Sequence, residues 1–326
     1  MSSTDVVIIG AGLVGCSIAR ALSLAGLRTL NLDRLPAAGY GSTSHSSAII
    51  RPFYSHVTSC AIAHEARSNW LRWGEFVNLG ESAALAEYRE TGGMVLIKEG
   101  EEHQFDANLA AFDEIGVEYE LIDAAGLAKR LPGISLHSFG PAKPMTDPGF
   151  GAPTYGRISG AIFIPACGHV SDPQLAAANL AASAAAGGGK FVYGVKVVDF
   201  LRHHDRVTGV VLDNGDSVQA ALVINAAGPH SAAVNAMAGI SEQLRIKTSA
   251  QRHEVAYLAA PPDHGRADTG LLVDLDAGYY ARRDGSDLLI GTADPACDAA
   301  DIVDPDDYSD SFTEQWTLQV YRAAQR

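Results

Sequence analysis

The sequence has few cysteines, no run of basic residues and no long apolar segment. Its four cysteines are scattered, with no Cys-x-x-Cys pair and no histidines at ligand spacing, so we expect neither a metal site nor a disulfide framework. With 24 Lys and Arg against 38 Asp and Glu, the net charge is −14, which disfavours nucleic acid as a partner. No stretch approaches the ~20 apolar residues of a membrane span, and no cationic leader precedes the first apolar run. We therefore expect a cytoplasmic protein.

A glycine-rich turn near the N-terminus is the strongest motif that the sequence does contain. Residues 6–9 form an apolar run, Gly10, Gly12 and Gly15 follow as G-x-G-x-x-G, and residues 13–25 have the pattern of a helix. Gly10 permits the tight turn, Gly12 admits a pyrophosphate to the backbone, and Gly15 lets helix and strand pack closely. The N–H groups of the helix N-terminus would face the phosphates. This order predicts a dinucleotide-binding β-α-β unit.

An acidic residue follows the glycines at the expected distance. A second strand, expected over residues 28–32, leads into Asp33, and the motif calls for an acidic residue ~20 residues on to bind a ribose hydroxyl. The chain then leaves this unit early and returns to it near residue 223, where a strand, a glycine and a helix start recur. This interleaving favours a flavin enzyme over a free-standing NAD domain.

The rest of the chain predicts a second, antiparallel unit. An Asp-Asn-Gly-Asp turn at residues 213–216 predicts a hairpin, and the Gly- and Pro-rich residues 133–159 predict a domain crossing or a mobile loop. We expect an α/β protein, α+β overall, with two interleaved domains. The first domain takes residues 1–90 and 150–240, and the second takes residues 91–149 and 241–326. Helices are expected over residues 56–79, 102–115, 124–131, 174–186, 230–237 and 311–324.

Five segments in this order resemble the D-amino-acid-oxidase-like superfamily of FAD-dependent oxidoreductases, nearest the sarcosine oxidase and dimethylglycine dehydrogenase branch. They are residues 7–15, 41–51, 168–173, 224–229 and 289–291. The resemblance implies a Rossmann-like FAD-binding domain interleaved with an antiparallel-sheet substrate domain. It also implies the FAD-contacting residues, which are Gly10, Gly12, Val14, Gly15, Asp33, Arg34, Ser42, Ser44, Ser46, Ser47, Val195, Ala226, Ala227 and Gly228.

Three further residues are implied in catalysis by the same resemblance. His45 corresponds to a histidine that is covalently tied to the flavin in dimethylglycine dehydrogenases, although Ser44 replaces the tryptophan that precedes it there. Hydrogen bonding of His45 to flavin or substrate is the alternative. Arg51 corresponds to an arginine that grips the substrate carboxylate, and Tyr280 to an active-site aromatic residue. Arg252 and His253 fall on a strand that borders the site, and the sequence does not choose between them.

The sequence departs from the family pattern in two places. The oxygen-activating lysine of sarcosine oxidases would fall near Leu289, where no lysine stands, which favours a dehydrogenase. A glycine-rich flavin-covering segment is missing before Arg326, so we expect either a fragment or a wall supplied by a partner subunit or a second copy.

The leading interpretation is FAD-dependent oxidation of the C–N bond of a secondary or N-methylated amino acid. One alternative is a 2-hydroxy acid dehydrogenase, with His45, His169 or His253 as the base. Another is a flavoprotein subunit that is active only within a complex.

Overall fold

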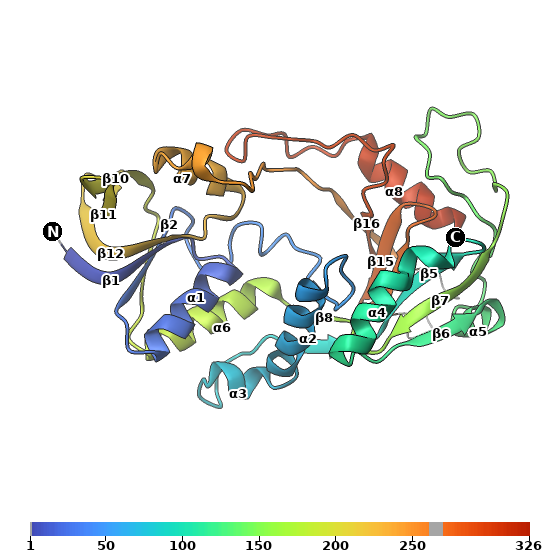
Figure 1. Cartoon of the computed structure of the whole chain (residues 1–326), viewed down its shortest axis with the longest axis horizontal. Helices are drawn as coiled ribbons and strands as arrows, with labels where there is room; N and C mark the ends of the chain where they lie inside the picture. The colour runs from blue at the N-terminus through green and yellow to red at the C-terminus, as the bar shows by residue number, and fades with distance from the viewer. Residues whose placement is uncertain (1, 261–269) are drawn as a thin grey trace.

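The structure is a computed structural model that describes residues 2–260 and 270–326, so part of the predicted second domain, residues 261–269, lies outside the described residues. The molecule is elongated, with one sheet at each end and helices between and around them (Figure 1). Three antiparallel strands, β3 (Ile49–Ile50), β8 (Gly168–Val170) and β4 (Tyr88–Glu90), make a small sheet of their own.

The first sheet contains the glycine motif. Its order is β10-β11-β12-β1-β2-β9, with bounds β1 Ser2–Ile9, β2 Thr29–Asp33, β9 Lys190–Tyr193, β10 Val197–His203, β11 Arg206–Leu212 and β12 Ser217–Asn225. β1 pairs in parallel with β2 and β12, and β2 pairs in parallel with β9. The parallel core requires crossovers, and helices α1 (Leu13–Leu24) and α6 (Pro173–Ala186) lie side by side beneath it (Figure 1). The β11–β12 hairpin turns at Gly215, where φ is +87°, as the sequence predicts.

The second sheet is mixed rather than purely antiparallel. Its order is β13-β16-β15-β14-β5-β7-β6, and only the β14–β5 pair is parallel among the described strands. The bounds are β5 Gly93–Lys98, β6 Glu120–Asp123, β7 Ile158–Ile164, β13 Val255–Ala259, β14 Leu271–Asp274, β15 Tyr279–Asp284 and β16 Asp287–Thr292. β7 belongs to this sheet, although the predicted boundary at residue 150 assigns it to the first domain; the domain boundaries stay a prediction.

Helices and short 3-10 turns fill the connections. They are α2 Val57–Leu71, α3 Trp73–Val77, η1 Glu102–Phe105, α4 Asp106–Ile115, α5 Ala124–Arg130, η2 Gly228–His230, α7 Ser231–Met237, η3 Ser241–Gln243 and α8 Glu314–Gln325. The helix expected over residues 56–79 is broken at Arg72, whose ψ of 41° is not helical. In the part of the chain that the structure describes, no helix is long and apolar enough to cross a membrane.

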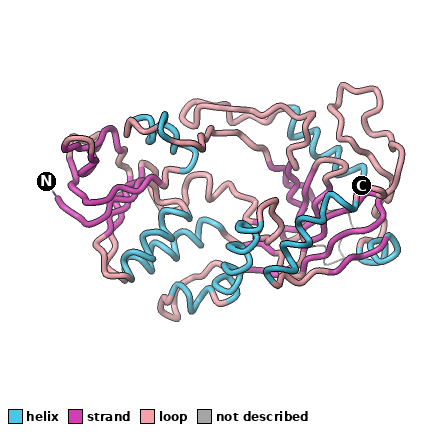
Figure 2. Tube along the Cα trace, viewed as in Figure 1, coloured by secondary structure: helices cyan, strands magenta, loops and turns pink. Residues whose placement is uncertain are grey.

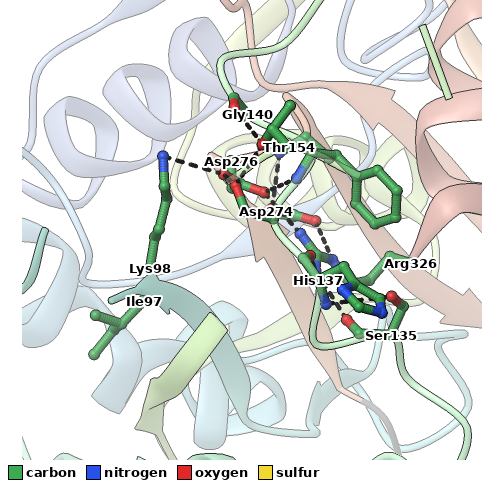
Figure 3. A network of polar contacts seen from close by, with 12 residues as sticks. Ile97, Lys98, Ser135, His137, Gly140, Thr154, Asp274, Asp276 and Arg326 are labelled. Atoms are coloured by element: carbon green, nitrogen blue, oxygen red, sulfur yellow. Dashed lines mark hydrogen bonds and ion pairs between the residues drawn. The ribbon is translucent and has the colours of Figure 1, made fainter. Parts of the chain in front are cut away.

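The Gly- and Pro-rich stretch between α5 and β7 forms a long loop without helix or strand (Figure 2). The strands that flank it in the chain, β6 and β7, belong to the same sheet, and a domain crossing or a mobile loop at this stretch stays a prediction. A buried polar network anchors the loop (Figure 3). Asp276 accepts hydrogen bonds from Ser138 Oγ and Phe139 N, both at 2.7 Å, and Arg326 Nε donates to Asp274 Oδ2 at 2.7 Å.

Candidate functional site

The glycine turn lies where its backbone meets other chain segments closely. Gly10 has a φ of +112°, and a Cβ there would overlap the carbonyl oxygen of Ala226 and lie 2.8 Å from its carbonyl carbon. A Cβ on Gly15 would lie 3.0 Å from the Gly10 carbonyl carbon. Both positions therefore require glycine, because any larger residue would push the turn away from its neighbours.

The N-terminus of α1 is open to an anion. Gly12 is its N-cap and offers no side-chain cap, and the first turn contains no acidic residue. Val14 lies on this turn with an exposed side chain. Apart from Leu13 N, which donates to Thr43 Oγ1, the N–H groups of this first turn and the helix dipole favour a phosphate at this end.

Asp33 stands at the carboxyl end of β2, beside the glycine turn. Its Oδ2 accepts from Ala11 N at 2.6 Å and its Oδ1 accepts from Leu35 N at 2.9 Å. Each carboxylate oxygen keeps a further lone pair for a ribose hydroxyl. Val195 N donates to the Asp33 carbonyl at 3.1 Å, so this residue also lies at the same edge.

The serine-rich loop, residues 41–48, packs against the glycine turn. Thr43 Oγ1 accepts from Leu13 N at 3.1 Å, on the first turn of α1. Ser44 Oγ donates to the Gly41 carbonyl at 2.9 Å, and Ser46 Oγ accepts from Ala48 N at 3.0 Å. The loop is thus held by its own hydroxyls at the helix N-terminus.

The segment after β12 closes the same edge. Ala226 N donates to the Ile9 carbonyl at 2.9 Å, and Ala227 N donates to Asn225 Oδ1 at 3.1 Å. Gly228 has a φ of +57°, and a Cβ there would lie 3.7 Å from Ser42 Oγ. The glycine turn, the serine-rich loop and residues 226–228 therefore meet at the carboxyl ends of β1 and β12, where doubly wound sheets bind dinucleotides. A helix N-terminus without acidic residues in its first turn, the nearby serine hydroxyls and the Asp33 carboxylate fit the pyrophosphate and ribose of FAD.

A cavity of about 580 Å³ adjoins the serine-rich loop on the side of the second sheet. Arg51 and Tyr280, for which the family resemblance implies active-site roles, both line it, together with Ser47. The Arg51 guanidinium lies over the Tyr54 ring, 4.5 Å from its centroid, and makes no ion pair with any residue that the structure describes.

Tyr280 owes its place to a glycine. Tyr280 on β15 pairs with Gly291 on β16, and a Cβ at Gly291 would lie 2.6 Å from Tyr280 Cε1. The phenol ring therefore lies flat across the glycine and forms part of the cavity wall.

The structure distinguishes His253 from Arg252. His253 lines the cavity, and its Nδ1 lies 3.7 Å from Oδ1 of Asp294, another lining residue. Arg252 instead pairs with Glu254 at 2.7 Å and Asp301 at 2.8 Å. Asp294 adopts a φ of +52°, a left-handed conformation that non-glycine residues rarely take outside functional sites and turns.

The other two histidines that the sequence offers as candidate bases, His45 and His169, are not among the residues that line the cavity. His45 is exposed, and its Nδ1 lies 3.1 Å from the Gly41 carbonyl and 3.2 Å from Ser44 Oγ. His169 is buried on β8, where burial, with the nearby Arg282 guanidinium second, lowers the pKa of its imidazole to about 4. Cys167 lines the cavity, and burial raises the pKa of its thiol to about 12, so it is no thiolate nucleophile.

Sequence reasoning missed several residues of this region. Arg282 is buried on β15 and its Nε donates to the Ser47 carbonyl at 2.8 Å, which ties the second sheet to the serine-rich loop. Thr43 lies among the serines and was not predicted, although its hydroxyl group is the kind of side chain that can accept a hydrogen bond at a helix N-terminus. Asp294 follows a β-strand without any motif, so no local signal marks it. Among the described residues, no group of His, Cys, Asp and Glu could hold a metal ion.

Comparison with known proteins places the chain in a family. Its sequence is 25% identical over 289 residues to 4-methylaminobutanoate oxidase (formaldehyde-forming) of Paenarthrobacter nicotinovorans, covering 89% of this chain and 31% of that protein. It is 24% identical over 290 residues to mitochondrial dimethylglycine dehydrogenase of Mus musculus, covering 88% of this chain and 30% of that protein. The chain thus spans about a third of the length of these relatives.

Solved structures share the fold. L-proline dehydrogenase from P. horikoshii superimposes with a TM-score of 0.78 at 20% identity, covering 99% of this chain and 77% of that one. The family model described as DAO, FAD dependent oxidoreductase, matches residues 5–326. The chain therefore belongs to the DAO family of FAD-dependent oxidoreductases.

Proposed function

We propose that the protein oxidises the C–N bond of a secondary or N-methylated amino acid, with FAD as the cofactor. The observation that carries this proposal is Arg51, a guanidinium in the cavity wall without an ion-pair partner among the described residues. A planar guanidinium binds a carboxylate through two parallel hydrogen bonds, so it suits an amino-acid substrate. The two curated relatives are named for N-methylated amino acids, 4-methylaminobutanoate and dimethylglycine, and these names support this substrate class.

Bound FAD would supply the acceptor for a hydride from the carbon next to the substrate nitrogen. Gly10, Gly12 and the N-terminus of α1 would hold its pyrophosphate, and Asp33 its ribose. Arg51 would fix the substrate carboxylate, while the Tyr280 ring and the apolar side chain of Met94 would confine the alkyl groups. Fixing the substrate at these points orients the reacting carbon, which is the main contribution that the protein makes.

The serine-rich loop would contribute the remaining contacts. Ser42, Ser44, Ser46 and Ser47 would face the cofactor with hydroxyl or backbone groups, and residues 226–228 would cover it from the other side. The Nδ1 atom of His45 is engaged by the loop, which leaves Nε2 as the nitrogen for a covalent bond to flavin. Acid precipitation of the protein would leave the flavin in the pellet if this bond exists.

One observation favours a second candidate, a 2-hydroxy acid dehydrogenase. That reaction needs a base for the hydroxyl proton, and His253 lines the cavity with Asp294 3.7 Å away. His169 is a poor base, because its pKa of about 4 leaves its neutral form weakly basic. Turnover of 2-hydroxyglutarate but not of sarcosine, dimethylglycine or proline would favour this candidate.

The test is an anaerobic titration of the purified protein with sarcosine, dimethylglycine and proline, followed by the flavin absorbance. Arg51→Met removes the charge with similar volume, and we expect the apparent Kd to rise about 10- to 150-fold, because a hydrogen bond to a charged group contributes about 1.5–3 kcal/mol. Arg51→Lys is the matched control that keeps the charge, and its apparent Kd should lie between those of wild type and Arg51→Met. An N-methylated amine without a carboxylate should reduce wild type and Arg51→Met equally.

Equal Kd values for wild type and Arg51→Met with every amino acid would contradict the role of Arg51. A flavin that no amine reduces would favour a subunit that is active only with a partner or a second copy. We also propose a cytoplasmic location, which fractionation of the source cells would test.

A further inference from the structure

An acidic segment connects the two halves of the molecule. It comprises residues 301–311, here called the acidic strap, and lies between β16 and α8 in the chain. The strap leaves the second sheet, extends to the vicinity of α7 beside the first sheet, and returns to α8 (Figure 1). Its path therefore crosses between the substrate half and the dinucleotide half.

Arg252 fastens both arms of the strap at its root. Its Nε lies 2.8 Å from Asp301 Oδ2, and its Nη1 donates to the Ser309 carbonyl at 2.6 Å. The backbone adds two bonds, from Arg252 N to the Asp301 carbonyl at 2.8 Å and from Val303 N to the Ala250 carbonyl at 3.0 Å. The strap is thus a defined loop with a fixed base.

The tip of the strap is a tight turn that presents Asp306. Asp306 N donates to Asp304 Oδ1 at 2.9 Å, and Asp307 N donates to the Asp304 carbonyl at 3.1 Å. These bonds form an Asx-type turn, which fixes the direction of the residue at its centre.

Two cationic side chains and one histidine of the dinucleotide half surround the Asp306 carboxylate. His230 Nε2 lies 2.8 Å from Oδ1, the Arg34 guanidinium pairs with the same oxygen, and Lys196 Nζ lies 3.8 Å from Oδ2. The pKa of Asp306 is held below its usual range, first by the hydrogen bond with His230 and then by Arg34. The carboxylate is therefore ionised at neutral pH.

These three groups mark one end of the dinucleotide site. Arg34 directly follows β2, Lys196 follows β9, and His230 follows β12, so all three lie beyond the carboxyl ends of strands of the first sheet. Arg34 is next to Asp33, the residue expected to bind the adenosine ribose. The tip of the strap consequently lies beside the residue that is expected to bind the adenosine ribose.

We propose that Asp306 is a positioning residue for the cofactor, which holds the acidic strap closed over the adenosine end of FAD through Arg34 and His230. The inference rests on the proposed function only in requiring bound FAD. The rival interpretation makes Asp306 a competitor, whose carboxylate occupies cationic groups that would otherwise attract the cofactor phosphates. The two interpretations predict opposite effects of removing the charge.

The experiment measures access to the adenosine end in the purified holoenzyme. A phosphodiesterase that cleaves the FAD pyrophosphate is added, and released AMP is followed over time; the readout works for covalent and non-covalent flavin alike. For Asp306→Asn we expect AMP release about tenfold faster, since several partly exposed charge contacts are lost together. Asp306→Glu should restore slow release. Asp310→Asn is the matched control, because it makes the same charge change on the strap at a residue without an ion pair among the described residues.

Salt gives a second prediction of the same proposal. Raising the ionic strength should speed AMP release from wild type and narrow its difference from Asp306→Asn, because these contacts are partly exposed to solvent. Wild-type rates in Asp306→Asn would overturn the proposal, and slower release would support competition instead. AMP release requires no turnover, so a failure to oxidise N-methylated amino acids leaves this test intact, whereas a protein that binds no FAD would contradict both proposals.

Discussion

The contact between Tyr280 and Gly291 gives a sharp test of the cavity wall. The two residues face each other on β15 and β16, and the phenol ring lies across the glycine. In Gly291→Ala the added Cβ would lie 2.6 Å from Tyr280 Cε1, closer than real side chains approach one another. The ring must therefore move, and Leu289 and the other buried residues of β16 restrict movement of the backbone.

The size of the effect follows from the cost of overpacking. One extra methyl group in a well-packed site costs about 1–3 kcal/mol. If the displaced ring enters the cavity, kcat/KM for the amino-acid substrate falls by about 5- to 150-fold. FAD content should stay the same, because neither residue belongs to the dinucleotide site.

A double-mutant cycle with Tyr280→Ala isolates this contact. The smaller side chain removes the overlap, so Gly291→Ala should have almost no effect on kcat/KM in the Tyr280→Ala background. The assay is steady-state turnover with an artificial dye acceptor, with flavin absorbance as a check on cofactor content. The reasoning is refuted if Gly291→Ala lowers kcat/KM by the same factor in both backgrounds.

Two further predictions concern stability. Arg326→Met leaves the buried carboxylates of Asp274 and Asp276 without their guanidinium. It should lower the free energy of unfolding, measured by urea titration, by about 3–5 kcal/mol. The control is Arg89→Met, which removes an exposed ion pair, and an equally small effect of both variants would contradict the prediction. His169 should make stability rise with pH. Its folded pKa of about 4 lies below the ordinary 6.5, so the unfolded chain binds the extra proton between these values. The loss on acidification is about 3 kcal/mol, present in full below the folded pKa, and His169→Gln should flatten the profile.

The dinucleotide half could be predicted closely because its signals are local. The glycines of the motif, the apolar strand before them and the Asn-Gly hairpin each depend on a few neighbouring residues, and the structure forms all three. The sequence predicts Gly10 for a tight turn and Gly15 for close packing of helix and strand. The structure adds that Gly10 also lies against the backbone of Ala226.

The second half could be predicted only in part, because its contacts join distant segments. The pairing of β7 with β5 and β6 depends on the apolar faces of all three strands, so the proposed boundary at residue 150 had no local signal against it. The hydrogen bonds of the loop over residues 133–159 could not be predicted from its sequence, because their buried acceptor, Asp276, lies far along the chain.

The cavity beside the serine-rich loop shows the same division between what local sequence predicts and what only the fold reveals. Arg51 and Tyr280 came from a family resemblance and line one cavity, whereas Asp294 and the choice of His253 over Arg252 required the fold. Asp306 could not be found from sequence, since its partners Arg34 and His230 are separated from it by most of the chain or by the second sheet.

The central claim, FAD-dependent oxidation of an N-methylated or secondary amino acid, is tested most directly by one spectrum. The purified protein is made anaerobic, its visible absorbance is recorded, and sarcosine, dimethylglycine or proline is added. We expect a flavin spectrum that at least one of these amino acids bleaches, with little bleaching by 2-hydroxyglutarate. A protein that contains and takes up no flavin, or a flavin bleached by the hydroxy acid alone, would contradict it.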